Sequence, residues 1–387
     1  MNEKIDVCRG LFAYLVVTAH AFELACSLDP GWAGPLPPVV RNFLFYGVGS
    51  GVFYVMGFFV LSGYCIQSSV RRQIVNDGFP LKTYMIARLT RILPLYYLAL
   101  LFTVVVEYVT PLWTSRPTIW SNGVSGKVLL CQTLLIQNFT QTFGSFAPSW
   151  SITSEVAYYI LFGVLAAVCV PLRLRPAVVG MGVCAGVGLI LQIVYRAGFQ
   201  SPAVLGTGLL FGLGTIWFLG ALVAENTSGF REAPGLLTIA RAWPLTLALS
   251  IGMWCSQRVH QEFVFLAAGG AFTLMLIHFI GQQRPAPTEP RREPRRHTEF
   301  LGLTSYPTYL FHGPILLAFG AALQAAGVAT PWWKIWPAAT LFALACCAPM
   351  GVLLELPIMV WRAGLLKRLK SAPAPRAAAP SILGIPQ

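Results

Sequence analysis

The chain starts with the apolar stretch I-D-V-C-R-G-L-F-A-Y-L-V-V-T-A-H, which runs from Ile5 to His20. It resembles a membrane-spanning helix, but it carries Arg9 near its start and His20 eleven residues later. This gap is close to three helical turns, so both side chains lie on one face, about 16 Å apart along the axis. Charged and titratable groups inside a bilayer usually face a polar cavity or a partner. The stretch therefore predicts a spanning helix with a polar face, although a snorkelling arginine and a histidine satisfied by a neighbouring helix would give the same pattern.

The composition of the chain extends this interpretation to the whole protein. Of its 387 residues, 56% are hydrophobic and only 11% are charged. A soluble domain carries about 25% charged residues, so the chain is an integral membrane protein. Its nine cysteines form no CxxC pair, a pattern that suits small buried apolar residues better than disulfides or a metal site. The net charge of +13 is explained by basic cytoplasmic loops, and we expect no nucleic-acid partner.

Apolar runs of about 20 residues, the length that crosses a bilayer, recur along the chain. We expect an all-α polytopic membrane protein with about ten transmembrane helices. The predicted spans are residues 8–27, 44–67, 84–109, 148–171, 176–195, 203–224, 237–256, 262–281, 303–327 and 335–361.

The connections between these spans are mostly short, so residues 1–362 are expected to form one membrane domain. Within the longest connection, 110–147, a partly apolar stretch predicts either a half-embedded helix or a helix lying flat at the interface. A Pro/Arg-rich loop at 284–297 is expected to be solvated. The tail, 363–387, starts basic and ends in an Ala/Pro string that we expect to be disordered and cytoplasmic.

The distribution of basic residues predicts the orientation of the bundle. If the N-terminus is cytoplasmic, 21 of the 27 Lys and Arg residues fall on the inner side. Cytoplasmic loops carry this kind of excess, so we expect both termini in the cytoplasm. The first apolar run, followed by Ala19-His20-Ala21, also imitates a signal peptide with its cleavage site. Arg9, His20 and the many later spans favour a first helix that is retained.

The third predicted span begins R-L-T-R-I-L-P-L-Y-Y and places Arg88 and Arg91 three residues apart, on adjacent faces of one turn. Two guanidiniums at the mouth of a span can snorkel to lipid headgroups. They can also form a clamp for phosphate, because guanidinium groups bind phosphate oxygens with two parallel hydrogen bonds. A phosphorylated cytoplasmic donor would suit the second alternative.

Other polar residues interrupt the second, fourth and ninth spans. Glu155 enters an apolar helix after Trp150, and a buried carboxylate needs a cation or another partner. His312 lies in S-Y-P-T-Y-L-F-H-G-P-I, where a structural hydrogen bond is the simpler explanation. Ser62-Gly63, at the end of F-F-V-L-S-G, is typical of close helix packing in membranes.

Five motifs follow one another along the chain: I-D-x-x-R-G-x-x-A…V…H, F-F-V-L-S-G, R-x-x-R-I-x-P-x-Y, W-S-x-x-x-E-x-x-x-Y and S-Y-x-x-Y-L-x-H-x-P-I. In this order they resemble the membrane-bound acyltransferase family 3, which includes bacterial polysaccharide O-acetyltransferases. The resemblance runs from Asp6 to about Trp361. It implies a ten-span core in the bacterial inner membrane that moves an acyl group, typically acetyl from acetyl-CoA, to a sugar hydroxyl. Two departures are Met56-Gly57, where many members carry an acid, and the single Glu155, where a double acid is frequent.

The resemblance also implies roles for individual residues. We expect His20 to be the general base, or a transient acyl carrier, because imidazole with a pKa of about 6.5 can accept a proton at neutral pH. Glu23 is expected to orient it, and Glu155 is the second candidate catalytic residue. The phosphates of acyl-CoA are expected to be held by Arg9, Arg88 and Arg91. Acceptor-binding or structural roles are expected for Ser62, Trp150, Ser151, Tyr309 and His312.

The expected partners are acyl-CoA as co-substrate, a sugar, glycan or glycolipid acceptor, and the lipid bilayer, with no permanently bound cofactor and no metal. We expect His20 and the arginines to share one continuous channel. A transporter that exports a glycan or a lipid-linked substrate is the competing class, since it would also line its path with Arg, His and Glu. The ordered motifs and the absence of visible inverted repeats favour the enzyme.

Overall fold

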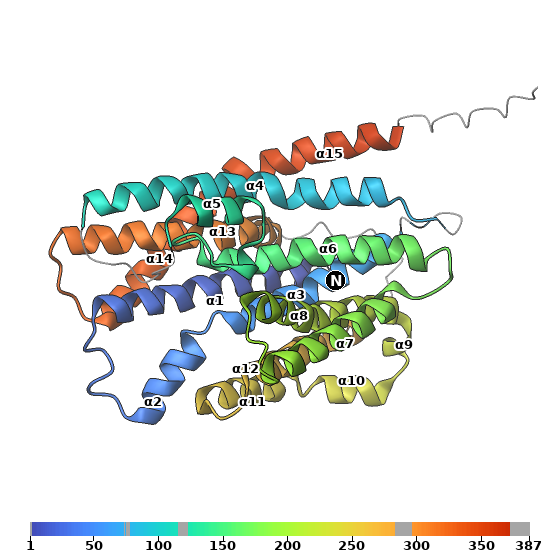
Figure 1. Cartoon of the computed structure of the whole chain (residues 1–387), viewed down its shortest axis with the longest axis horizontal. Helices are drawn as coiled ribbons and strands as arrows, with labels where there is room; N and C mark the ends of the chain where they lie inside the picture. The colour runs from blue at the N-terminus through green and yellow to red at the C-terminus, as the bar shows by residue number, and fades with distance from the viewer. Residues whose placement is uncertain (1, 73, 75–77, 115–122, 283–295, 372–387) are drawn as a thin grey trace, which may run out of the picture.

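The computed structural model describes residues 2–72, 74, 78–114, 123–282 and 296–371, and in these ranges helices joined by turns and loops make up the chain, with no strand. The long helices run side by side along the long axis of the molecule (Figure 1). They are α1 (Asn2–Leu28), α3 (Val52–Val70), α4 (Leu81–Val109), α6 (Trp150–Cys169), α7 (Pro176–Arg196), α8 (Pro202–Glu225), α12 (Gln261–Gly281), α13 (Arg296–Ala325), α14 (Trp332–Met350) and α15 (Leu356–Ser371). Shorter helices are α2 (Pro38–Asn42), α5 (Gly126–Thr133), α9 (Thr227–Arg231), α10 (Pro234–Ala240) and α11 (Trp243–Ser256).

The all-α, multi-pass membrane architecture predicted from the sequence is confirmed. In the described part of the chain, 8 helical segments are long and apolar enough to cross a membrane, or 9 if the bent pair α10–α11 is one span. α13 is not among them, because polar side chains interrupt its apolar sequence. It nevertheless packs against α1, α4 and α14 within the bundle. Residues 363–371 of the predicted tail continue α15, whereas 372–387 and most of the predicted Pro/Arg-rich loop lie outside the described residues.

Three of the predicted spans are interrupted rather than continuous. The span predicted at 44–67 passes from the π-helical turn Phe43–Val48 to α3 across residues 49–51. The span predicted at 237–256 is the pair α10 and α11, bent by 42° where Pro244 enters the first turn of α11 without a backbone N–H to donate. The span predicted at 335–361 changes from α14 to a π-helical turn, Gly351–Glu355, before α15 begins. Pro349 and Pro357 flank this turn, and a π turn re-aims the side chains that follow it.

The close packing predicted for Ser62-Gly63 is present between α3 and α8. A Cβ placed on Gly63 would lie 1.9 Å from the carbonyl oxygen of Trp217, and one on Gly220 would lie 1.9 Å from that of Val60. Any larger residue at either position would push the two helices apart. This contact buries Trp217 completely at the centre of the bundle.

The connection between α4 and α6 folds back onto the bundle. Gln132, at the end of α5, is fully buried and donates to the Tyr96 hydroxyl at 2.6 Å and to Ser149 Oγ at 2.9 Å. Tyr96 lies in the middle of α4, so the connection reaches well into the depth of that helix. It therefore packs against the start of α6 and against α13, where Gly313 lies too close to the Ser145 carbonyl to carry a side chain.

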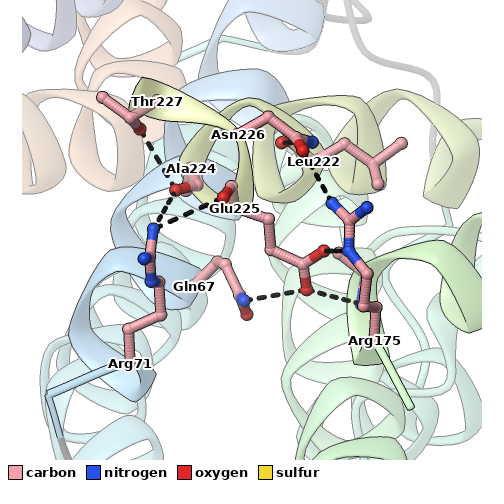
Figure 2. A network of polar contacts seen from close by, with 9 residues as sticks. Gln67, Arg71, Arg175, Leu222, Ala224, Glu225, Asn226 and Thr227 are labelled. Carbon is pink, nitrogen blue, oxygen red and sulfur yellow. Dashed lines mark hydrogen bonds and ion pairs between the residues drawn. The ribbon is translucent and has the colours of Figure 1, made fainter. Parts of the chain in front are cut away.

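A polar network joins the ends of α3 and α8 to the start of α7 (Figure 2). The Glu225 carboxylate accepts from Arg175 Nε at 2.9 Å, from Gln67 Nε2 at 2.9 Å and from the backbone N–H of Ala177 at 3.3 Å. Arg71 donates to the carbonyl oxygen of Ala224 at 3.0 Å. These contacts satisfy the carboxylate and fix the three helix ends relative to one another.

Candidate active site

A cavity of about 250 Å³ lies among α1, α3, α4, α6, α13 and α15. Four guanidiniums line it, and Glu155 is the acid among its lining residues. We call it the arginine cavity; its polar lining residues are Arg9, Ser62, Cys65, Arg88, Arg91, Ser151, Glu155, Tyr159, Ser305, Tyr306, Tyr309 and Arg362. The structure thus brings together the three arginines predicted to hold acyl-CoA phosphates and adds a fourth from α15.

The four arginines differ in how fully they are neutralised. Arg91 forms an ion pair with Glu355, whose side chain is 0% exposed, and its guanidinium lies 5.7 Å from the centre of the Tyr306 ring. Arg9 lies 4.0 Å from Asp6, one turn earlier on α1. Burying a charge is expensive unless it is paired, so Glu355 stabilises Arg91 in its place. The π turn before α15 is what carries Glu355 to this position.

Arg88 and Arg362 have polar partners but no carboxylate among the described residues. Arg88 Nη2 donates to Ser69 Oγ at 2.9 Å, and its Nε is buried without a hydrogen-bond partner in the described structure. Arg362 donates twice to the Ala87 carbonyl oxygen, at 3.1 and 2.9 Å. A buried guanidinium that keeps an unused donor is suited to an incoming anion.

Glu155 finds hydroxyl partners rather than a cation. Its Oε1 accepts from Ser62 Oγ at 2.7 Å and from the Tyr159 hydroxyl at 2.5 Å. Trp217 Nε1 donates to Ser62 Oγ at 3.1 Å, which orients that hydroxyl toward the carboxylate. Ser62 therefore donates a hydrogen bond to Glu155 in the cavity, while the neighbouring Gly63 allows α3 and α8 to pack closely.

A pair of histidines lies at a separate place on α1 and α13. His20 Nδ1 is 2.8 Å from His312 Nε2, and the two rings are nearly parallel with centres 5.0 Å apart. His312 is completely buried, and its Nδ1 lies 3.0 Å from the Thr308 carbonyl oxygen. No local sequence pattern predicts this pair, because 292 residues separate its members. Glu23 was expected to orient His20, but the ring contact found here comes from His312.

The hydrogen bonds determine the tautomers of the two neutral rings. A carbonyl oxygen only accepts, so the proton of His312 is on Nδ1 and its Nε2 carries a lone pair. His20 must then donate from Nδ1, which leaves the lone pair of His20 on Nε2. That nitrogen faces the start of α3, where a Cβ on Gly51 would lie 3.7 Å away. Gly51 thus lies beside this nitrogen, at the start of α3.

Tyr309 lies between the two polar regions. It lines the arginine cavity, and its ring centre is 6.0 Å from that of His312. Its hydroxyl donates to the Pro148 carbonyl oxygen at 2.9 Å and lies 2.6 Å from Ser151 Oγ. His20 and His312 are not among the lining residues of the arginine cavity, which ends at the Tyr309 side of the histidine pair. The expectation that His20 and the arginines share one continuous channel is therefore not met by this cavity.

The predicted residues therefore divide into three groups. Arg9, Arg88, Arg91, Ser62, Glu155, Ser151 and Tyr309 line one cavity, and His20 pairs with His312 next to it. Trp150 packs against Phe59, which separates it from that cavity, and lines another cavity described below. Glu355 and Arg362 were not predicted from the sequence. Glu355 could have been found by the rule applied to Glu155, since it is an isolated acid in an apolar run.

Comparison with known proteins adds one result. The family described as an acyltransferase domain matches residues 2–352, which is nearly the whole chain. No curated protein and no solved structure gives a match. The match covers α1 to α14 and includes both the histidine pair and Arg9, Arg88 and Arg91 of the arginine cavity. The chain therefore belongs to acyltransferase family 3 and is a multi-pass membrane acyltransferase.

Proposed function

We propose that the protein is an O-acyltransferase that moves an acyl group, which we take to be acetyl, from acyl-CoA to a hydroxyl of a sugar in a surface polysaccharide or glycolipid. The observation that carries this proposal is the His20–His312 pair beside the arginine cavity. The histidine pair supplies a nitrogen lone pair that can accept a proton, and the arginine cavity supplies cations that can hold a phosphorylated donor. We place the arginine cavity toward the cytoplasm of a bacterial inner membrane, where acyl-CoA is found.

The arginine cavity is the proposed donor site. Its volume of about 250 Å³ is small, so it takes one part of acyl-CoA rather than the whole molecule. Arg88 and Arg362, which have no described carboxylate partner, would bind the phosphate oxygens, and Arg9 would extend the basic surface along α1. The thioester would then lie near Tyr309, next to the histidine pair.

The proposed reaction is a direct transfer with His20 as the base. The sugar hydroxyl gives its proton to His20 Nε2 while its oxygen attacks the thioester carbonyl carbon. Collapse of the tetrahedral intermediate breaks the carbon–sulfur bond, and the thiolate of CoA takes the proton back from His20. His312 holds the ring of His20 through Nδ1 and stabilises its protonated form, because the His312 Nε2 lone pair accepts the Nδ1 proton in either state.

The test is acetyl transfer from acetyl-CoA by the purified chain in nanodiscs, with His20→Ala compared with His278→Ala. His278 contacts Gln282 at the end of α12, outside the site, so its variant controls for loss of a membrane histidine. We expect His20→Ala to lower turnover by about 100- to 10,000-fold, the usual contribution of a general base, with acetyl-CoA binding retained. Full activity of His20→Ala would remove the base assignment. Substrate flux across the membrane without acetyl-CoA consumption would instead indicate an exporter.

A further inference from the structure

A second cavity, of about 500 Å³, lies between the 137–142 segment, the starts of α3, α6 and α12, and α8. It contains no residue of the arginine cavity. Its lining combines side-chain amides with aromatic rings, and we call it the amide cavity. The residues of this lining that matter here are Gln137, Asn138, Gln141, Trp150, Gln261 and Phe265.

Two of these amides keep unused acceptors. Gln137 is 2% exposed, and its Oε1 has no hydrogen-bond partner among the described residues. Asn138 donates from Nδ2 to Ser154 Oγ at 2.8 Å, yet its buried Oδ1 also has no described partner. Buried polar atoms are normally satisfied, so unpaired amide oxygens at a cavity indicate a ligand that donates hydrogen bonds. A sugar presents many hydroxyl donors, and the rings of Trp150 and Phe265 offer flat apolar surfaces to its C–H faces.

An apolar groove adjoins the amide cavity. It has a volume of about 250 Å³ and lies between α7, α8 and α12. Leu209, Leu213 and Phe265 line both spaces, so the groove and the amide cavity share a wall. Glycines at 188, 208 and 212 give the groove its depth. This combination of an apolar groove and a polar cavity matches an amphiphile with an aliphatic chain and a polar head.

Charged residues at the groove limit what the polar head can be. Arg196, at the end of α7, lines the groove and supplies a cation. Glu262 lines it too, but its carboxylate accepts from Gln192 and lies 3.9 Å from His260 Nδ1. An anionic group would therefore bind on the Arg196 side of the groove. A phosphate between an aliphatic chain and a sugar fits this arrangement.

The amide cavity also has a route toward the proposed base. Val52 lines the cavity, and a Cβ on its neighbour Gly51 would lie 3.7 Å from His20 Nε2. A sugar in the amide cavity would thus lie against the start of α3, at the helix end that faces His20. The donor site, in contrast, lies on the other side of Phe59 and Trp150.

We propose that the amide cavity and the apolar groove together form the acceptor site, and that the acceptor is a sugar linked through phosphate to a long aliphatic chain. The sugar occupies the amide cavity and the chain occupies the groove. This inference rests on the proposed acyltransferase function and goes further by assigning the acceptor class and its site.

The test fills the groove without disturbing the fold. A Cβ on Gly212 meets nothing within 4 Å, so Gly212→Leu places a side chain in the groove without a clash at its first atom. Gly182→Leu is the matched control, since Gly182 has the same open surroundings on α7 and does not line the groove. The probes are polyprenyl-phosphate-linked N-acetylglucosamine and the water-soluble methyl glycoside of the same sugar, with acetyl-CoA as donor.

We expect the wild-type chain to acetylate the polyprenyl-linked sugar with a KM at least about tenfold lower than that for the methyl glycoside. Gly212→Leu should raise the first KM by about tenfold and leave acetyl-CoA binding and the KM for the methyl glycoside unchanged, whereas Gly182→Leu should match wild type. Retained acetyl-CoA binding shows that the variant is folded. Equal KM values for the two sugars, or unchanged kinetics in Gly212→Leu, would overturn the acceptor site while leaving the acyltransferase intact. Absence of acetyl transfer to either sugar, with a phospholipid found in the groove by native mass spectrometry, would overturn both.

Discussion

Two regions of this protein each bring arginines close to a carboxylate, and they differ in how many hydrogen-bonding groups of their charged residues are left over. In the Glu225 network, the carboxylate has three described donors, which lie at the end of α3 and at the start of α7 (Figure 2). In the arginine cavity, four guanidiniums surround an open space and Arg88 Nε has no described partner. The acceptors of the Glu225 carboxylate are used without a ligand, although Gln67 Oε1 beside it has no described partner, whereas the arginine cavity leaves a guanidinium donor unpaired.

The difference shows why the presence of charged residues in a membrane protein does not by itself identify a binding site. A fully satisfied network fixes helix ends, and filling it with a ligand would require breaking existing bonds. A cavity with unpaired cations gains favourable contacts when an anion enters. Both sites contain arginines and a carboxylate, so residue type does not separate them. The number of charged groups that lack a hydrogen-bond partner does separate the structural Glu225 network from the proposed donor site.

The largest effect is expected when the comparison is tested with two arginine variants. Arg88→Ala should raise the KM for acetyl-CoA, because loss of a charge-assisted hydrogen bond costs about 1.5–3 kcal/mol, which is about 10- to 100-fold. Arg175→Ala, in the Glu225 network, should leave that KM unchanged. Steady-state kinetics in nanodiscs measure both. Equal KM values for Arg88→Ala and wild type would show that Arg88 contacts lipid headgroups instead of the donor.

A second prediction concerns stability at the Glu225 network. Glu225→Gln removes the charge that Arg175, Gln67 and the Ala177 N–H share, and it should lower the free energy of unfolding by about 1–3 kcal/mol. The ion-pair part of this loss is small, because the Arg175 side chain is 53% exposed. Thermal unfolding in detergent reports the change, and the donor KM should stay at the wild-type value. A raised donor KM would show that this network belongs to the functional site, and the two regions would then not differ in role.

Within the arginine cavity, Glu355→Gln is expected to change donor binding less than Arg88→Ala does. Glu355 neutralises Arg91 in the arginine cavity, so its removal frees a cation for the phosphates of the donor. We expect the KM for acetyl-CoA to fall by a few-fold, while the melting temperature falls because a buried cation loses its partner. Kinetics and thermal unfolding of the same preparation measure the two changes. An increase in KM would mean that Glu355 orients Arg91 for the donor rather than competing with it.

Local sequence patterns predicted most of the fold. Hydropathy predicted the 8 or 9 described segments that are apolar enough to cross a membrane, because each helix must bury its backbone polar groups and present apolar side chains, both properties of a continuous stretch of sequence; α13, a tenth predicted span, falls below this limit. The interruptions at α10–α11 and at the π turn before α15 were missed. Prolines at both places indicated that a break was possible. Whether a helix bends at its proline or stays straight depends on the helices packed around it.

The candidate site was predicted less completely, and the reason is the sequence distance between its parts. Arg9 and His20 could be placed on one face because both lie on α1, where the helical repeat fixes their directions. The contact of His20 with His312, and of Arg91 with Glu355, joins residues that no local pattern connects. Arg362 looked like one more cytoplasmic charge until α15 was seen to pack against α4.

The sequence by itself thus determined the membrane class, the helices and the polar face of α1, since hydropathy and helical periodicity act over a few turns of one chain segment. Only the tertiary structure decided which helices meet. It paired the two histidines, assigned their tautomers, neutralised Arg91 and left Arg88 with an unused donor. Those features arise from contacts between distant segments, and they separate a polar residue that stabilises the bundle from one that is available to a substrate.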